Sequence, residues 1–276
     1  MHLHILGICG TFMGGIAAIA RQAGHKVTGC DANVYPPMST QLEAQGIELI
    51  EGFSPDQIAL KPDLFIIGNV VSRGNPLMEA ILEQGLPYQS GPQWLGEQVL
   101  QGKHVLAVAG THGKTTTSAL LTWVLSQCSL NPSFAVGGII RELNANACHG
   151  SGDYFVAEAC ESDGTFLKYS PYGAIVTNID NDHMDFYRDE QALIAAFSEF
   201  MSKVSSHPHL FWCGDDARLV QLKPPGISYG LGSNCQLRAS NFRQYRWEIS
   251  FDVFFQGKKY SQLIVPLTGQ HNALNA

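Results

Sequence analysis

The chain has 276 residues, with 17 basic and 24 acidic side chains and a formal net charge of −7. This length allows one large domain or two ordinary ones, each able to bury a core, and we expect two. The chain is acidic overall and has no long run of like charges. These two features exclude a broad surface for nucleic acid or for an anionic membrane. An anionic ligand would have to be held by local loops and metal ions.

The cysteines and the apolar runs of the sequence indicate the cellular compartment of the protein. The seven cysteines are scattered and never spaced as CxxC, which favours reduced thiols over a disulfide framework or a zinc site. The N-terminus lacks the features of a signal peptide, and no uncharged apolar run approaches the roughly 18 residues of a membrane helix. We therefore expect a cytoplasmic protein with no nucleic-acid or membrane partner.

The first part of the chain alternates short apolar runs with helical ones. Strands are expected at residues 3–8, 26–31 and 64–69, with helices at 13–24, 38–46 and 76–85 and a last one within 87–102. Strands that alternate with helices predict a parallel sheet. The resulting Rossmann-like domain is placed at residues 1–101.

The second domain is placed at residues 102–276 and is expected to be of the P-loop ATPase type. It contains apolar strands at 104–110, 154–160 and 173–179 and a helix at 189–204. The helix after the first of these strands has an expected apolar face of Leu120, Leu121, Val124 and Leu125. The expected fold class is therefore α/β throughout, with one exception near the end of the chain.

That exception is a small antiparallel sheet. Residues 247–255 alternate strictly, with Trp247, Ile249, Phe251, Val253 and Phe255 expected on one side. A turn at residues 256–258 leads into a second strand at 260–267. The pattern predicts a half-buried hairpin at the edge of the second domain.

The stretch GTHGKT, which begins at Gly110, joins an apolar strand to a helix. Glycines let the backbone approach a phosphate, Lys114 can reach terminal phosphates, and the Thr115 hydroxyl can bind Mg²⁺. The general P-loop pattern requires a further glycine where this chain has Val108. The structural alternative is a glycine-rich turn with a solvated lysine, but the flanking strand and helix favour a phosphate site.

Polar side chains follow two later strands. Because the carboxyl ends of parallel strands meet at one edge of the sheet, we expect them to converge on the loop. Their carboxylates and one histidine predict a Mg²⁺ site that could also accept Mn²⁺. The residues are Glu158, Glu161 and Asp163 after one strand, and Asn178, Asp180, Asp182, His183 and Asp185 after the other.

Together, the segments GTHGKT, EACESDGTF, TNIDNDHMD and GQHNALNA resemble the Mur ligases. These ATP-dependent enzymes add amino acids or peptides to a UDP-muramic acid precursor of the bacterial cell wall, in peptidoglycan biosynthesis and recycling. The family's loop reads G-T-x-G-K-[ST] and also lacks the additional glycine. The resemblance covers essentially the whole chain.

The resemblance implies residue roles in the second domain. Lys114, Glu158 and His183 would be catalytic, and Thr115, Glu158 and His183 would bind Mg²⁺. ATP would contact Gly110, Thr111, His112, Gly113, Lys114, Thr115, Thr116, His271, Asn272 and Asn275. In the implied reaction, the muramyl lactyl carboxylate attacks the γ-phosphate of ATP, and an amine displaces phosphate from the acyl phosphate.

The first domain allows two interpretations. ILGICGTFMGG resembles a dinucleotide fingerprint, but Cys9 and Phe12 replace its glycines, which disfavours an NAD-dependent oxidoreductase. The resemblance to Mur ligases instead implies a UDP-N-acetylmuramate site. Helix-to-sheet packing is the alternative role for Met13 and Ile16. The implied UDP-sugar residues are Gly10, Thr11, Met13, Asp31, Asn69 and Ser72.

Two branches of the family remain open. The first-domain motifs resemble the branch that joins L-alanyl-γ-D-glutamyl-meso-diaminopimelate to UDP-N-acetylmuramate, and this recycling reaction is favoured. The motifs after the loop are closer to the branch that adds L-alanine. A non-catalytic UDP-sugar or nucleotide sensor is the alternative of another class. Family members also have a third domain, which the sequence lacks, so we expect these residues alone to bind substrates but not to ligate.

Overall fold

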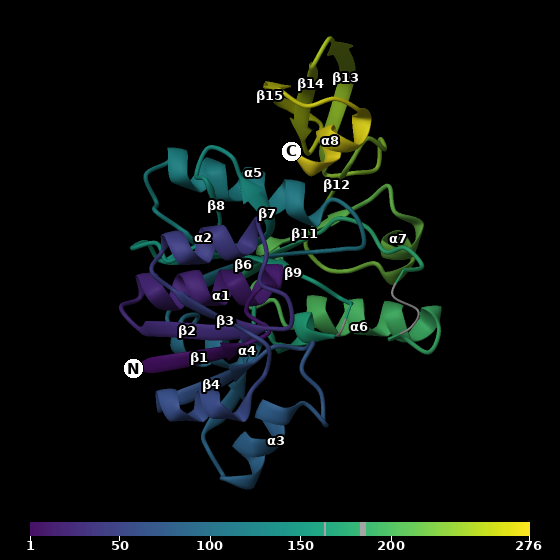
Figure 1. Ribbon diagram of the computed structural model, residues 1–276. Coiled ribbons are helices and arrows are strands. Elements are labelled where there is room, and N and C mark those ends of the chain that lie inside the picture. The colour runs from purple at the N-terminus through teal and green to yellow at the C-terminus, as the bar shows by residue number, and fades with distance from the viewer. Residues whose placement is uncertain (163, 183–185) are drawn as a thin grey trace. The chain divides into compact units, whose positions relative to one another are not determined.

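The computed structural model describes residues 1–162, 164–182 and 186–276 (Figure 1). They form two compact units. Unit 1 contains Met1–Lys103 and Ser129–Phe155, and unit 2 contains His104–Cys128 and Val156–Ala276. Contacts thus group residues 129–155, which the sequence places in the second domain, with unit 1. The division into 1–101 and 102–276 stays a prediction.

Unit 1 is built on a parallel sheet, as the alternating pattern predicts. The strand order is β3-β2-β1-β4-β5, and every pair is parallel. The strands are β1 (His2–Leu6), β2 (Lys26–Asp31), β3 (Glu48–Glu51), β4 (Leu64–Ile67) and β5 (Tyr88–Ser90). The helices are α1 (Thr11–Gln22), α2 (Met38–Ala44), η1 (Pro55–Leu60), α3 (Pro76–Glu83) and α4 (Gly91–Gln98). The α/β class is confirmed for this unit.

A hairpin completes unit 1 and was not expected from the sequence. It pairs β7 (Ser133–Ile140) with β8 (Ala145–Cys148) in antiparallel fashion, and both strands contact α1. The side-chain amide of Asn146 in β8 donates a hydrogen bond to the carbonyl of Thr11, at 3.3 Å. The hairpin therefore braces the start of α1.

Unit 2 contains a mostly parallel sheet that continues into antiparallel strands, in the order β15-β14-β13-β12-β11-β10-β6-β9. The parallel part is β6 (His104–Ala109), β9 (Tyr154–Ala159), β10 (Gly173–Val176), β11 (Leu210–Cys213) and β12 (Ile227–Gly230). The helices are α5 (Lys114–Gln127), η2 (Thr165–Lys168), α6 (Glu190–Ser202), η3 (His207–His209) and α7 (Ala217–Leu222). β9 begins in unit 1 and ends in unit 2.

The expected apolar face of α5 is only partly buried: Leu120, Leu121 and Leu125 are half-buried, but Val124 is exposed. Val124 is 47% exposed, and the buried residues of the helix are Thr117, Ser118 and Thr122. The Thr122 hydroxyl has a hydrogen-bond partner within the helix, because it donates to the Ser118 carbonyl at 2.8 Å. This bond removes the cost of an unpaired polar group at Thr122, whereas the hydroxyls of Thr117 and Ser118 are buried without a hydrogen-bond partner among the described residues.

The antiparallel part of unit 2 has three strands: β13 (Leu237–Tyr245), β14 (Glu248–Phe255) and β15 (Lys258–Val265). Ile249 and Phe251 are buried on the predicted inner side, whereas Trp247 is 83% exposed because it lies in the turn before β14. Figure 1 shows these strands beside the last helix, α8 (Gln270–Asn275), which contributes Ala273 to their core. Among the described residues, no helix is both long and apolar enough to span a bilayer.

Candidate functional site

The loop between β6 and α5 requires glycine at two positions. Gly110 has a φ of +132°, and a Cβ there would lie 2.0 Å from the Thr177 hydroxyl oxygen. Gly113 has a φ of +85° and is the N-cap of α5, with no side-chain cap hydrogen bond. Val108, where the general pattern wants glycine, is a buried residue of β6 that pairs with Ile175 of β10. The strand therefore continues to Ala109, and the loop is shorter than a general P-loop.

The backbone N–H groups in the first turn of α5 have no side-chain cap. These groups and the positive end of the helix dipole make a helix start of this kind an anion-binding position. Lys114 and Thr115 are the first two residues of the helix, and Thr116 follows on the same turn. The local geometry thus fits a phosphate group.

The ammonium group of Lys114 is held by three oxygen acceptors. It donates to the carbonyl of Gly110 at 2.6 Å, to the carbonyl of Thr111 at 3.2 Å and to Oε2 of Glu161 at 2.9 Å. The side chains of Lys114 and Glu161 are only 11% and 1% exposed. Glu161 lies just beyond β9, so the carboxyl ends of β6 and β9 do meet.

The next residue of the helix, Thr115, pairs with Glu158 at the end of β9. The Thr115 hydroxyl donates to Oε1 of Glu158 at 2.9 Å. Adjacent ligands of an octahedral Mg²⁺, each at about 2.1 Å, lie about 3.0 Å apart, so these two oxygens are spaced as neighbouring magnesium ligands. His183, the third predicted ligand, lies outside the described residues, as do Asp163 and Asp185. Within the described ranges, no group of three His, Cys, Asp or Glu side chains is arranged to hold a metal.

Asn178, which follows β10, holds the backbone of the loop between β6 and α5. Its side-chain oxygen accepts from the His112 N–H at 2.8 Å, and its side-chain amide donates to the His112 carbonyl at 2.9 Å. Its own carbonyl accepts from the Thr111 N–H at 3.0 Å. The Thr177 hydroxyl also donates to the His112 carbonyl, at 2.6 Å. The sequence indicated Asn178 as part of a polar cluster but not this bracing role.

Asp180 and its neighbours extend the brace. The Asp180 N–H donates to the Thr111 hydroxyl at 2.8 Å. Arg218, in α7, donates to the Ile179 carbonyl at 2.9 Å and to Glu190 at 2.5 Å. The hydrogen bond to Glu190 raises the pKa of the Arg218 guanidinium. Sequence reasoning missed Arg218 because nothing in its local pattern differs from a solvated helix residue.

The segment GQHNALNA places one predicted residue at the loop. A Cβ on Gly113 would lie 2.4 Å from the side-chain oxygen of Asn275, so Asn275 lies against the loop. Asn275 in turn donates to the Asn272 side chain at 3.1 Å. His271 instead folds over Gly269, where a Cβ would lie 2.5 Å from its ring.

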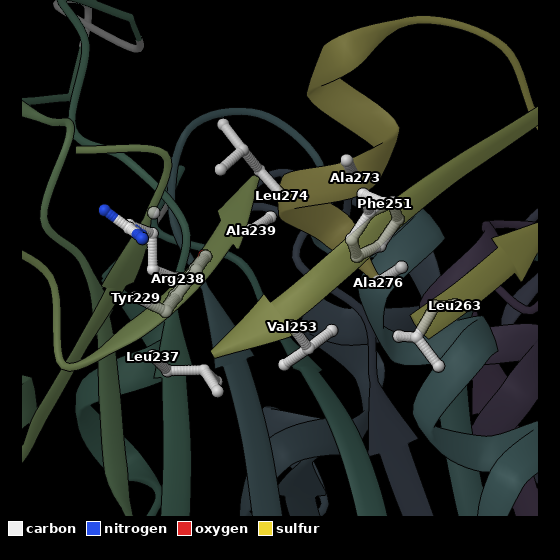
Figure 2. Close-up of a pocket in the computed structure, with 11 residues that line it drawn as sticks. Tyr229, Leu237, Arg238, Ala239, Phe251, Val253, Leu263, Ala273, Leu274 and Ala276 are labelled. Carbon is white, nitrogen blue, oxygen red and sulfur yellow. The ribbon is translucent and has the colours of Figure 1, made fainter. Parts of the chain in front are cut away.

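A pocket on the other side of α8 contains none of the predicted site residues. Figure 2 shows it between α8 and the antiparallel strands, with Phe251, Val253 and Leu274 among its lining. Arg238 lies at this pocket, and its guanidinium is 5.2 Å from the centre of the Phe254 ring. The pocket is therefore separate from the loop described above.

In unit 1, the predicted UDP-sugar residues gather at the carboxyl ends of β1, β2 and β4. β1 pairs with both β2 and β4, and the chain reverses its strand order there, which is where ligands of open parallel sheets bind. A Cβ on Gly7 would lie 2.7 Å from a methyl of Val70, so the loops after β1 and β4 are in contact. Asn69 and Ser72 are exposed on the second of these loops.

The loop after β1 is tied to β2 through Asp31. The Cys9 N–H donates to Oδ2 of Asp31 at 2.9 Å. Burial and the nearby Asp31 charge raise the pKa of the Cys9 thiol. Gly10 is the N-cap of α1 without a side-chain cap bond, and Thr11 begins the helix with an exposed side chain. This helix start is available to an anion in the same way as that of α5.

Met13 differs from the other predicted UDP-sugar residues. Its side chain is 4% exposed, and a Cβ on Gly91 would lie 2.7 Å from its sulfur atom. Ile16 is fully buried. Both positions have the packing expected of a helix on a sheet, so the structure offers no side-chain surface at Met13 to a ligand.

Comparison with known proteins gives matches along nearly all of the chain. Residues 2–103 match the Mur ligase family, catalytic domain, and residues 108–276 match the Mur ligase middle domain. The UDP-N-acetylmuramate–L-alanyl-γ-D-glutamyl-meso-2,6-diaminoheptandioate ligase of Escherichia coli is 44% identical over 100% of this chain. The UDP-N-acetylmuramate–L-alanine ligase of Protochlamydia amoebophila is 43% identical over 99%.

A solved structure agrees with both. The crystal structure of UDP-N-acetylmuramate:L-alanyl-γ-D-glutamyl-meso-diaminopimelate ligase from Neisseria meningitides is 40% identical, with a TM-score of 0.90. The match covers 99% of this chain and 90% of that one. The chain spans 62% of the length of the Escherichia coli relative and 60% of the Protochlamydia relative. On these matches and on the loop geometry, the chain belongs to the Mur ligase family.

Proposed function

We propose that the chain carries the ATP and UDP-N-acetylmuramate sites of an ATP-dependent ligase that forms an amide bond. The observation that carries this proposal is the arrangement at the start of α5, where Lys114 faces the phosphate position beside the Thr115–Glu158 oxygen pair. A lysine, an uncapped helix start and two oxygens at magnesium spacing are the parts that phosphoryl transfer needs.

In this proposal, positioning and charge neutralisation do most of the catalysis. The loop N–H groups and the Lys114 ammonium bind the terminal phosphates of ATP, and Thr115 and Glu158 hold Mg²⁺, for which Mn²⁺ could substitute. The metal, when bound, neutralises phosphate charge. His183 is proposed as a further ligand. The lactyl carboxylate then attacks the γ-phosphate, and an incoming amine displaces phosphate from the acyl phosphate.

The remaining predicted residues complete two binding sites. Asn275 and Asn272 lie on the side of α8 that faces the loop, which supports a role beside the base of ATP; His271 would have to turn away from Gly269 to join them. In unit 1, the uncapped start of α1 suits a diphosphate, and Asn69 and Ser72 are exposed beside it. The proposed ATP contacts are Gly110, Thr111, His112, Gly113, Lys114, Thr115, Thr116, His271, Asn272 and Asn275. The proposed UDP-sugar contacts are Gly10, Thr11, Asp31, Asn69 and Ser72.

For the acceptor, we propose the tripeptide L-alanyl-γ-D-glutamyl-meso-diaminopimelate. Two relatives named for this acceptor are 44% and 42% identical to the chain. L-Alanine is the second candidate, because a relative named for it is 43% identical. Acceptor-dependent ADP release in the presence of UDP-N-acetylmuramate, measured on the full-length gene product, separates the two: we expect greater release with the tripeptide, and greater release with L-alanine would reverse the assignment.

Calorimetric titration with ATP tests the nucleotide site. We expect Mg²⁺-dependent binding that Lys114→Ala abolishes, since the ammonium is the cation at the phosphate position. Glu158→Gln should weaken binding in Mg²⁺ while changing metal-free binding little. Glu199→Gln, which removes an exposed carboxylate of α6, is the matched control. Binding by Lys114→Ala at wild-type affinity would contradict the proposed site.

A further inference from the structure

The ammonium group of Lys114 has no donor left for a nucleotide. A lysine has three N–H donors, and the three oxygens within 3.2 Å of Nζ belong to Gly110, Thr111 and Glu161. A phosphate oxygen can bind Nζ only if it replaces one of these acceptors. Nucleotide binding at this loop is therefore an exchange reaction on the lysine.

Of the three acceptors, Glu161 competes most strongly with an incoming phosphate for the Lys114 ammonium group. The other two acceptors are neutral carbonyls of the loop itself, whereas Glu161 carries a negative charge at 2.9 Å from Nζ. A hydrogen bond between two charged groups is stronger than one to a neutral carbonyl, so this contact costs most to break. Repulsion between the carboxylate and a polyphosphate adds to the effect.

Glu161 is fixed in place by its own surroundings. Its carbonyl accepts from the buried Tyr187 hydroxyl at 2.6 Å and from the Gly164 N–H at 3.0 Å. Its side chain is 1% exposed. Because the backbone of Glu161 is anchored and its side chain is buried, we expect the exchange to move the lysine, which has a flexible four-carbon side chain.

We propose that Glu161 is a positioning residue for Lys114: it holds the ammonium at the loop between nucleotides and releases it to the phosphates of Mg·ATP. This inference rests on the proposed ATP site. Under this proposal, the two glutamates of the segment EACE, residues 158–161, have different roles. Glu158, which pairs with Thr115, serves the metal, and Glu161, three residues later, holds the lysine.

The test is Mg·ATP affinity of Glu161→Gln, measured by calorimetry on the whole 276-residue chain. Glutamine has the same shape and keeps a neutral acceptor, so we expect affinity to rise about fivefold as the competing charge is lost. The gain must depend on the lysine. In a Lys114→Met background, Glu161→Gln should restore no Mg·ATP binding. Glu199→Gln again controls for the loss of one charge.

A second readout begins with the wild-type protein. In wild-type protein, the Lys114 ammonium should give an NMR signal protected from exchange, and Mg·ATP should shift it. Glu161→Asp, which keeps the charge but shortens the side chain, should weaken that protection and raise Mg·ATP affinity less than glutamine does.

Three results would overturn the inference. Glu161→Gln could bind Mg·ATP no more tightly than wild type, or the gain could be equal with and without Lys114, or the wild-type Lys114 signal could remain unchanged on binding. Each of these leaves the proposed ATP site standing if wild type binds Mg·ATP in a Lys114-dependent way. Wild-type protein that does not bind Mg·ATP would instead remove the proposed site and the inference together.

Discussion

At the residue scale, the clearest electrostatic feature outside the two sites is His4, buried in the middle of β1. Its Nδ1 lies 2.8 Å from the Thr28 hydroxyl and its Nε2 lies 2.9 Å from the side-chain oxygen of Gln57. Burial lowers the pKa of His4 to about 4 from its ordinary value of 6.5, against a smaller opposing effect of the Gln57 hydrogen bond. Protonation of the buried ring would therefore destabilise unit 1.

This burial predicts a pH-dependent stability with a definite sign. Between pH 6.5 and about 4 the unfolded chain binds a proton at His4 that the folded chain does not, so the free energy of unfolding falls as the pH is lowered. The loss approaches about 3 kcal/mol near pH 4. Above pH 6.5 this contribution is complete.

Urea unfolding as a function of pH measures the effect. His4→Gln removes the titrating group, so its stability should fall less steeply than that of wild type between pH 6.5 and 4. Parallel curves for wild type and His4→Gln would contradict the assignment.

At the element scale, the loop between β6 and α5 owes its shape to the segment that follows β10. Asn178 makes two side-chain hydrogen bonds to the backbone of His112, and its carbonyl accepts a third from Thr111. A loop with two left-handed glycines has little conformational preference of its own. The residues that follow β10 therefore hold the loop in one conformation, which its glycines alone would not do.

We expect Asn178→Ala to reduce Mg·ATP affinity about tenfold and to destabilise the fold by about 1–2 kcal/mol, because it removes two hydrogen bonds from the loop. Calorimetry and urea unfolding measure the two effects. Asn234→Ala, at an exposed position in unit 2, is the matched control. Undiminished Mg·ATP affinity in Asn178→Ala would show that the loop orders itself.

The sequence predicts elements well where one period dominates. The strands β1, β2, β4, β6, β9 and β10, together with α6 and the inner face of β14, follow from their apolar patterns. The strands β3, β5, β11, β12 and β13 were not predicted. The prediction for α5 was incomplete because the apolar pattern does not indicate the burial of Thr117, Ser118 and Thr122, of which only Thr122 forms a side-chain hydrogen bond within the helix. The hairpin of β7 and β8 was missed because glycines interrupt its apolar run, and contacts far along the chain determine its pairing with α1.

Motifs likewise predicted the position of the candidate site better than its internal contacts. The convergence of Lys114, Thr115 and Glu158 follows from the rule that parallel strands end at one edge. The Lys114–Glu161 pair and the Asn178 brace do not follow from any spacing rule, because they depend on side-chain geometry across three strand ends. Pairings of this kind become visible only with coordinates.

At the scale of the whole molecule, the same device occurs once in each unit. α1 and α5 both follow a parallel strand, both begin with a glycine N-cap, and neither glycine provides a side-chain cap. Each helix start is therefore suited to phosphate groups. We propose that the first binds UDP-N-acetylmuramate and that the second binds ATP, as two separate sites.

The most direct measurement is a crossed titration of both ligands against variants of both units. Lys114→Ala should abolish Mg·ATP binding and leave UDP-N-acetylmuramate affinity unchanged. The double variant Asn69→Ala with Ser72→Ala should weaken UDP-N-acetylmuramate binding at least tenfold, about 1.4 kcal/mol or more, and leave Mg·ATP affinity unchanged. If either variant impaired both ligands equally, or neither, the assignment of the two sites would be contradicted.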